Sequence, residues 1–391
     1  MSAPRARIAA ALALALALGP APASAAVAGA EAPHLPAASA TAAGAPRDRD
    51  GFRLAVPPWS FRFPQDHAAH PQFRTEWWYY TGHLAGGGRT YGYEQTFFRI
   101  GLPARRPAGG SAWSPRDLVF EHLALTDESR GRFRHAEAGR RAVLGMAGAD
   151  SSRYDVRLGD DRASLAPDGR THRLRGAAPD FALDLVLEPL KAPVPHGARG
   201  VSQKTAGPGQ ASHYYSITRM ATHGTLVDGA DTLAVTGTSW MDHEFGSSRM
   251  AATHAGWDWF GVQLDDGREL MFYRLRLRDG RIEPFSHGTL VARDGGTRPL
   301  ALADVRVRAS GTWRSPHTQA VYPSGWTLEV PGEGLVLELE PTVRDQELVA
   351  ASMGGVAYWE GSVRVRGTSR GARIGGQGYV ELTGYGGRAP F

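Results

Sequence analysis

The sequence contains no cysteine in 391 residues, and lysine occurs only twice, as Lys191 and Lys204. The lack of cysteine excludes disulfides, thiolate metal ligands, a cysteine nucleophile and a lipid-modified N-terminal cysteine. Basic residues are otherwise all arginine, and no run of them exceeds a pair such as Arg140-Arg141. The net charge of +5 therefore does not indicate a nucleic-acid partner.

Long apolar runs are also scarce, and the one that stands out is residues 8–18. It follows Arg5 and Arg7 and precedes the small-residue pattern Ala23-Ser24-Ala25, which is typical of a cleaved export signal. The run is too short to cross a bilayer, so no membrane span is expected. Residues 1–26 are predicted to be a signal peptide for the general secretory route, and residues 27–51 a disordered leader. The mature protein is expected to be periplasmic or secreted.

Helical periodicity is hard to find beyond the leader. Short apolar segments with period 2 alternate with turns rich in glycine, proline and aspartate, such as Asp265-Asp266-Gly267. This pattern predicts an all-β fold, and a hydrophobic content of 42% is ample for two cores. At most one short helix is expected, either starting at Ser114-Pro115 or within residues 134–147.

The stretch EWWYYTGHL, residues 76–84, places four consecutive aromatic side chains between a carboxylate and a glycine. Alternate side chains of a strand share a face, so Glu76, Trp78 and Tyr80 lie together. Trp77 and Tyr79 then lie on the opposite face. One face is expected to pack into a core and the other to line an interior space. The alternative is a strand simply buried on both faces.

A second stretch, WDWFGVQL at residues 257–264, resembles the first at a constant offset of 180 residues. The matching pairs are Trp77 with Trp257, Tyr80 with Phe260, and Leu84 with Leu264. Each stretch leads through a Gly-Arg turn into another aromatic-rich strand, which is a hairpin pattern. The repeat predicts two related β domains, residues 52–250 and 251–391. Chance similarity between two strands is the alternative.

Five motifs occur in a fixed order along the chain: Phe63-Pro64-Gln65-Asp66-His67, Glu76-Trp77-Trp78-Tyr79-Tyr80-Thr81-Gly82, Tyr214-Tyr215-Ser216, Trp240-Met241-Asp242-His243-Glu244-Phe245-Gly246 and Gly256-Trp257-Asp258-Trp259-Phe260. Together they resemble the carotenoid 1,2-hydratase / AttH-type family of lipocalin-like proteins, over about residue 52 to the C-terminus. The resemblance implies two lipocalin-like antiparallel β-barrel domains packed side by side.

The family includes hydratases that act on the isolated end double bonds of acyclic carotenoids, and many exported members of unsettled activity. The resemblance also implies a link to an envelope transport system. This sequence departs from the hydratases proper in carrying an export signal, so a carotenoid is not carried over as its substrate.

The chemistry of alkene hydration suits a carboxylic acid among tryptophans. An unactivated alkene must be protonated to a tertiary cation, which water then captures, and the proton must come from an acid kept neutral by apolar surroundings. Aromatic faces stabilise the cation, and no metal or organic cofactor is needed. Asp242 is therefore predicted as the general acid, with Glu244 as second choice. The alternative role for both is a structural carboxylate at the domain junction.

The predicted ligand-binding residues come from the two aromatic hairpins and the acidic segment: Glu76, Trp77, Trp78, Tyr80, Glu94, Trp240, His243, Trp257 and Trp259. Within this set, Glu76 and Glu94 are the weaker candidates for the acid, because acidic residues in barrel strands often pair with arginine. Asp258 is in the same class. No metal site is predicted, because His67, His70 and His122 show no metal-binding spacing.

Two functions remain open at this point. The first, which the export signal favours, is an exported protein that binds an apolar isoprenoid or lipid-like small molecule in an aromatic-lined pocket. The second is a cofactor-free hydratase, isomerase or cyclase that uses a buried carboxylic acid. A third possibility, a carbohydrate binder, would require solvent-facing tryptophans. A buried carboxyl group with a raised pKa distinguishes catalysis from binding.

Overall fold

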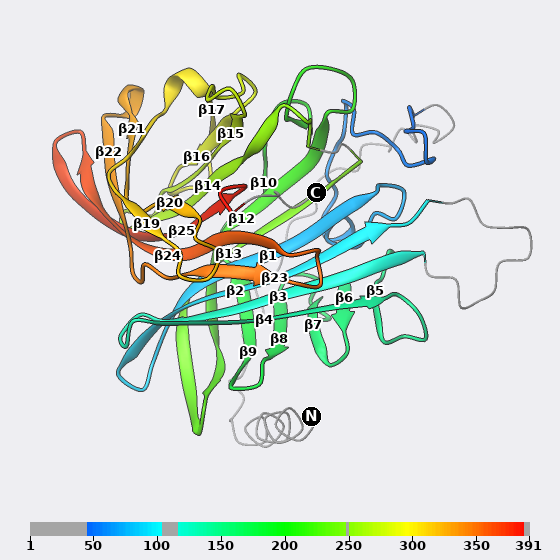
Figure 1. Cartoon of the computed structure of the whole chain (residues 1–391), viewed down its shortest axis with the longest axis horizontal. Coiled ribbons are helices and arrows are strands. Elements are labelled where there is room, and N and C mark those ends of the chain that lie inside the picture. Colours follow the sequence, from blue (N-terminus) through cyan, green and yellow to red (C-terminus); the bar gives the residue numbers. More distant parts are fainter. Residues whose placement is uncertain (1–44, 104–115, 248–249, 387–391) are drawn as a thin grey trace, which may run out of the picture.

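The computed structural model describes residues 45–103, 116–247 and 250–386. Within these ranges the regular elements are strands, apart from three single-turn 3₁₀ helices, η1 (Gln65–His67), η2 (Leu302–Asp304) and η3 (Pro331–Glu333). The all-β prediction is confirmed. Figure 1 shows the strands in two groups, blue to green on one side and yellow to red on the other.

The first sheet holds thirteen strands: β1 (Thr75–Gly86), β2 (Arg89–Gly101), β3 (Asp117–Asp127), β4 (Arg132–Arg141), β5 (Ala147–Ala149), β6 (Asp155–Leu158), β7 (Asp161–Leu165), β8 (His172–Ala177), β9 (Phe181–Pro189), β10 (Val194–Pro195), β11 (Ser202–Gln203), β12 (Ala211–Asp228) and β13 (Asp231–Gly246). Its main order is β4-β3-β2-β1-β13-β12-β9-β8-β7-β6-β5, and β10 and β11 add to β12. The two ends approach each other where β3 and β4 contact β5 and β6, so the sheet is a nearly closed barrel.

The second sheet holds ten strands: β14 (His254–Leu264), β15 (Glu269–Leu277), β16 (His287–Val291), β17 (Thr297–Ala301), β18 (Arg306–Ala309), β21 (Trp326–Val330), β22 (Leu335–Pro341), β23 (Glu347–Ala350), β24 (Val356–Ser369) and β25 (Ala372–Thr383). A separate pair is formed by β19 (Thr312–Arg314) and β20 (Val321–Pro323). The prediction of two lipocalin-like antiparallel β-barrel domains packed side by side agrees with a nearly closed barrel and a second antiparallel sheet, each around its own core.

Strict alternation of apolar and polar residues explains the outer strands of the second sheet. In β22 the side chains of Leu335, Leu337 and Leu339 are buried, while Val336 and Glu338 are exposed. A strand with this pattern has one face on the core and one in water. β1 and β13 differ, because residues 76–82 and 239–246 are buried on both faces almost without a break. Both faces of these two strands are therefore covered by protein.

The two sheets share one pattern of strand pairing, in which the first strand lies between the second strand and the last. In the first, β1 pairs with the next strand, β2, and with the last strand of the sheet, β13. In the second, β14 pairs with β15 and with the last strand, β25. The first sheet ends at Gly246 and the second begins at His254. The predicted boundary near residue 250 falls between them, and separate folding of the two halves stays a prediction.

The two sheets pack face to face through β1 with β25, β2 with β24, and β12 with β14. One of the two lysines stabilises the contact between the two sheets, which we call the seam. Lys191 follows β9 and donates hydrogen bonds to Glu269 Oε2 at 2.6 Å and to the carbonyls of Gly267 and Ala292. Arg219 of β12 binds the other oxygen of Glu269, also at 2.6 Å. A buried carboxylate of the second sheet is thus held by two cations that precede that sheet in the sequence.

Two details of the sequence-based expectation are corrected. Residues 134–141 belong to strand β4 and not to a helix. The leader predicted to be disordered to residue 51 contains packed residues, because Asp48 and Asp50 both bind Arg74 at 2.5–2.6 Å. The predicted signal peptide and the helix start at residues 114–115 lie outside the described residues. The helices that the structure does describe are all too short to cross a membrane.

Candidate active site between the two sheets

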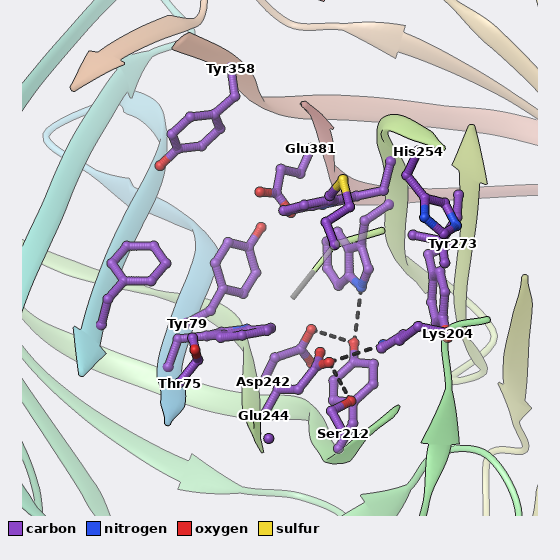
Figure 2. Close-up of a pocket in the computed structure, with 18 of the residues that line it drawn as sticks. Thr75, Tyr79, Lys204, Ser212, Asp242, Glu244, His254, Tyr273, Tyr358 and Glu381 are labelled. Atoms are coloured by element: carbon purple, nitrogen blue, oxygen red, sulfur yellow. Dashed lines mark hydrogen bonds and ion pairs between the residues drawn. The ribbon is translucent and has the colours of Figure 1, made fainter. Parts of the chain in front are cut away.

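A pocket of about 170 Å³ lies between the sheets. Strands β1, β2, β3, β12 and β13 line it from the first sheet, and β14, β15, β24 and β25 from the second. Figure 2 shows its side chains converging on a common space. For comparison, an engineered apolar cavity with a volume of about 150 Å³ in another protein binds benzene. The pocket is therefore large enough for a small ring compound or for the end of a longer molecule.

The pairing of β1 with β13 brings the aromatic stretch and the acidic segment together. Trp77 lies opposite Glu244 in the antiparallel register, and Tyr79 lies opposite Asp242. Opposed residues of neighbouring strands point to the same face of a sheet. All four line the pocket. Period-2 alternation thus placed Asp242 and Glu244 on one face, and the pairing of the first and last strands places that face against the aromatic wall.

Asp242 is 4% exposed and accepts hydrogen bonds from three side chains. Tyr214 Oη donates to Oδ2 at 2.6 Å, Trp240 Nε1 donates to Oδ1 at 2.6 Å, and the Ser216 hydroxyl donates to Oδ1. Neither arginine nor lysine pairs with this carboxyl group in the part of the chain that the structure describes.

The environment of Asp242 raises its pKa to about 7. Burial is the main cause, and the negative charge of Glu244 acts in the same direction. The hydrogen bonds from Ser216, Tyr214 and Trp240 act in the opposite direction. At neutral pH a substantial fraction of Asp242 is consequently protonated, and a carboxylic acid is available in the pocket.

A hydrogen-bonded chain behind Asp242 tolerates both protonation states. The Ser216 hydroxyl lies 2.7 Å from His196 Nε2, and His196 Nδ1 lies 2.9 Å from the Thr289 hydroxyl. Burial lowers the pKa of His196 well below its ordinary value, so the ring is neutral. A neutral imidazole and two hydroxyls can each exchange donor and acceptor roles. The chain can therefore donate to the Asp242 carboxylate or accept a bond from the Asp242 acid.

Glu244 has a different environment from Asp242. Lys204 Nζ lies 3.0 Å from Glu244 Oε1, and the Ser212 hydroxyl donates to the same oxygen. Burial alone would lower the pKa of Lys204, but Glu244 and Tyr273 outweigh it and raise that pKa, so the lysine stays cationic. The dashed contacts of Figure 2 show this pair beside Asp242. Two neighbouring carboxyl groups with different partners can have different protonation states. One can then act as an acid while the other stays a charged carboxylate.

Tryptophans of the second sheet complete the wall. Trp259 Nε1 donates to Tyr214 Oη at 3.0 Å, and Trp257 Nε1 donates to Glu381 Oε2 at 2.8 Å. Gly261 gives Trp259 its position, since a Cβ added there would lie 2.3 Å from the indole ring. The Trp-x-Gly spacing of β14 therefore lets the indole lie along its own strand and face the pocket.

The sequence model of the AttH-like family matches residues 54–385. The chain belongs to the AttH-like family. A crystal structure of a putative AttH from Nitrosomonas europaea is 35% identical and superposes with a TM-score of 0.77, over 85% of this chain and 100% of that one.

Two further proteins that are similar to this AttH-like protein are named as a hydratase and a dehydratase. The crystal structure of kievitone hydratase from Nectria haematococca has a TM-score of 0.66 over 83% of this chain and 92% of that one, at 14% identity, which shows a shared fold. Dehydratase asqC of Emericella nidulans is 21% identical over 218 residues. That match spans 54% of this chain and 61% of the relative.

Not every predicted ligand-binding residue of the AttH-like chain reaches the pocket. The pocket wall includes Trp77, Trp257 and Trp259. Trp240 lies behind the wall and supports Asp242, and Glu94 lies behind Thr96. Four others point to the interior of the first barrel, away from the pocket, because they occupy the opposite face of β1 and β13: Glu76, Trp78, Tyr80 and His243. Their grouping with the pocket residues is corrected.

Glu76 and Asp258 have structural partners. Glu76 Oε2 accepts a bond of 3.0 Å from Arg99 Nε, its register neighbour in β2. Asp258 binds Arg274 and Arg276 at 2.8 and 2.9 Å. Both are carboxylates paired with arginine, as expected for residues with a structural role in place of a catalytic one.

Inside the first barrel, His70, Glu76 and His243 bring possible metal-ligand atoms within 4.8 Å of one another. These atoms are already engaged in protein hydrogen bonds. His70 Nδ1 and His243 Nε2 both contact Glu76 Oε1, at 2.8 and 2.9 Å, and Arg99 contacts its other oxygen. Arg99 supplies the positive charge that a metal would otherwise provide. The cluster is a buried hydrogen-bond network.

Sequence reasoning missed several pocket residues: Lys204, Tyr214, Tyr273, Tyr358, Glu360 and Glu381. Three signals could have found some of them. Lysine is so rare here that each one invites a specific role, and Tyr214 belongs to a family motif that was given no function. In addition, Trp359-Glu360-Gly361 repeats the Trp-x-Gly spacing of Trp259 and Gly261. The middle residue of that repeat is a pocket carboxyl group.

Proposed function

We propose that this AttH-like protein is a cofactor-independent enzyme that adds water to, or removes water from, an apolar small molecule. The observation that carries the proposal is Asp242, a carboxyl group with its pKa raised to about 7 in a pocket walled by tryptophans. A buried acid poised near neutral pH is what general acid catalysis requires. The names of a hydratase and a dehydratase among the relatives support the same reaction class.

In the hydration direction, the Asp242 acid gives its proton to one carbon of the alkene, and the π electrons form the new C–H bond. Water then adds to the cationic carbon, and the proton it releases returns to the Asp242 carboxylate. The net change is alkene plus water to alcohol, with Asp242 restored. Dehydration is the reverse sequence.

Glu244 and the aromatic wall have supporting roles in this scheme. The charge of Glu244 favours the protonated form of Asp242, and Lys204 holds Glu244 in place. The faces of Trp257 and Trp259 are suited to stabilise the cation, by about 0.5–2 kcal/mol for each contact. Because Asp242 and Trp259 are themselves buried, these interactions act in a lower dielectric than that of water.

The volume of the pocket limits the substrate class. At about 170 Å³ it holds a small ring compound, or the end of an isoprenoid chain whose remainder lies outside. We therefore propose an apolar, isoprenoid-like or aromatic molecule with a double bond or a hydroxyl group near Asp242.

Binding without turnover is the second candidate. The three hydrogen bonds to Asp242 favour it, because they would also suit a carboxylate that only anchors Tyr214 and Trp240. In that case the protein carries the same class of apolar molecule without changing it.

One experiment separates the two functions. Mass spectrometry of an organic extract of the purified protein identifies the bound compound, which is then incubated with the protein in H₂¹⁸O. Catalysis predicts ¹⁸O in the alcohol, and Asp242→Asn should slow the incorporation by about 10²- to 10⁴-fold while binding is kept. A bound compound that never acquires ¹⁸O would leave binding as the function.

We also propose that the protein acts outside the cytoplasm after removal of residues 1–26. The arginine, apolar and small-residue pattern of that segment supports this. The intact mass of the protein recovered from its native host tests it, and a mass that retains residue 1 would contradict it.

A further inference from the structure

The pocket wall opposite Asp242 carries two carboxyl groups, Glu360 of β24 and Glu381 of β25, and Glu94 of β2 lies behind it. We call these residues the three-glutamate cluster. Glu94 and Glu360 are each 1% exposed. Figure 2 shows Glu381 and Tyr358 on the far side of the pocket from Asp242 and Glu244. No basic side chain in the described ranges forms an ion pair with the cluster, in contrast to Glu76, Glu244, Asp258 and Glu269.

The hydrogen bonds of the cluster leave two of its oxygen atoms without a partner in the described residues. One oxygen of each group accepts a bond: Glu360 Oε1 from Tyr79 Oη at 2.7 Å, Glu381 Oε2 from Trp257 Nε1 at 2.8 Å, and Glu94 Oε1 from the Thr96 hydroxyl. The Oε2 atoms of Glu94 and Glu360 have no partner among the described residues. In a carboxylic acid the carbonyl oxygen accepts and the hydroxyl must donate, so two donors lack acceptors.

The electrostatics agree with this assignment. Burial, and then repulsion from Glu381 and Glu94, raises the pKa of Glu360 well above its ordinary value. Burial raises the pKa of Glu94 to about 8 and that of Glu381 to about 7. Charged groups so close together cannot all be ionised without a counter-ion.

His122 adds a donor at the same end. Its ring is 1% exposed and lines the pocket, and burial lowers its pKa to about 3, so it is neutral. Nδ1 lies 2.5 Å from Tyr358 Oη, while Nε2 has no partner in the described structure. If Nδ1 accepts from the tyrosine, the ring proton is on Nε2 and points to no acceptor. Buried donors without partners are costly unless a ligand satisfies them.

We infer that the three-glutamate cluster and His122 bind an uncharged oxygen group of the ligand, a carbonyl or a hydroxyl, at the end of the pocket opposite Asp242. The inference deepens the proposed function, since it makes the substrate bifunctional: its reacting carbon lies at Asp242 and its oxygen at the cluster. An apolar hydrocarbon chain would leave these donors unsatisfied. The oxygen group thus orients the substrate.

Three probes with one carbon skeleton test the inference on the full chain: ethylbenzene, acetophenone and 1-phenylethylamine. Ligand-observed NMR titration measures their dissociation constants without any turnover. Acetophenone should bind about 2- to 12-fold more tightly than ethylbenzene, the range for a net hydrogen bond. The amine should bind no better than ethylbenzene.

Two variants of Glu360 make the test specific. Glu360→Gln keeps a donor in place of the acid and should keep the preference for acetophenone. Glu360→Met has a similar size but no donor, and should bring the ratio of the two constants close to one. If Glu360→Met does not fold, Glu381→Met gives the same comparison. Asp242→Asn is the control, because it should keep the preference even if it stops turnover.

Equal affinities of the wild type for ethylbenzene and acetophenone would overturn the inference, and so would the absence of binding by all three probes. A preference for 1-phenylethylamine that is lost in Glu360→Gln would also overturn it, in favour of a cation site. None of these outcomes depends on ¹⁸O incorporation, so failure of the inference and failure of the proposed function are distinguishable.

Discussion

Asp242 and His243 are consecutive residues of β13, but their side chains lie on opposite faces of the first sheet. Asp242 lines the pocket between the sheets, whereas His243 lies inside the first barrel, 2.9 Å from Glu76. Substitutions on the pocket face of this strand are therefore expected to change activity. Substitutions on the face inside the barrel are expected to change stability.

Activity should fall as the pH rises through about 7, because Asp242 must be protonated to act as the acid and its pKa is raised to about that value. Glu244→Gln removes a negative charge that raises this pKa. The falling limb of the plot of activity against pH should therefore move to lower pH. The rate of ¹⁸O incorporation against pH measures the shift. An unmoved limb in Glu244→Gln would mean that the titrating group is not Asp242.

Ser216→Ala should have the opposite effect. The Ser216 hydroxyl stabilises the Asp242 carboxylate and so lowers the pKa. Its removal should move the limb to higher pH by about 0.4–1.1 units, the equivalent of one hydrogen bond of about 0.5–1.5 kcal/mol. A purely structural role for Asp242 predicts a lower melting temperature for Ser216→Ala without a shifted pH profile.

Glu76→Gln should destabilise the first barrel by about 1–3 kcal/mol, because the buried Arg99 would keep Asp117 but lose its fully buried carboxylate partner. Burial raises the pKa of Glu76, but Arg99 and the two histidines outweigh it and lower that pKa well below its ordinary range. The stability this carboxylate contributes is present above the unfolded pKa of about 4.3 and is lost as the pH falls below it. Urea unfolding at pH 7 and pH 4 checks both points, and the variant should show the weaker loss on acidification. An unchanged unfolding midpoint at pH 7 would contradict the assignment.

Gly261→Ala should push Trp259 out of the pocket wall, since the added Cβ would lie 2.3 Å from its ring. We expect a loss of stability of about 1–3 kcal/mol, as for other overpacked sites, together with weaker binding of acetophenone. Gly148→Ala is the matched control, because a Cβ there meets no atom within 4 Å. Thermal melts and the NMR titration give both readings, and equal behaviour of the two variants would refute the packing argument.

Glu269→Gln should loosen the seam of the sheets, because Lys191 and Arg219 would lose their shared carboxylate. Limited proteolysis should then cut faster near residue 250 and release fragments that match residues 52–250 and 251–391. Asp266→Asn is the control, since its exposed pair with Arg268 is worth about 0–1 kcal/mol. Fragments that end inside either sheet would contradict the predicted domain boundary.

The sequence predicted the fold class and the central hairpins because both depend on local patterns. Alternation fixed which side chains of β1 and β13 share a face, and the motif order indicated the family. The same alternation should have excluded Trp78, Tyr80 and His243 from the pocket, but both faces of the strands were grouped together. Lys204, Glu360 and Glu381 could not be predicted in this way. They share one pocket because two sheets, distant in sequence, pack against each other. The scarcity of lysine and the repeated Trp-x-Gly spacing mark Lys204 and Glu360, but neither signal encodes that packing.

The location of the pocket has a practical consequence for finding its ligand. A molecule held there contacts β1 and β13 on one side and β14, β24 and β25 on the other, so it binds the assembled protein and not its separated halves. By mass action, a ligand at 100 times its dissociation constant adds about 2.7 kcal/mol to the stability of the assembled state. A change in melting temperature is then a direct measure of occupancy. A library of oxygenated terpenoids and phenolics can therefore be screened by thermal unfolding of the protein with each compound.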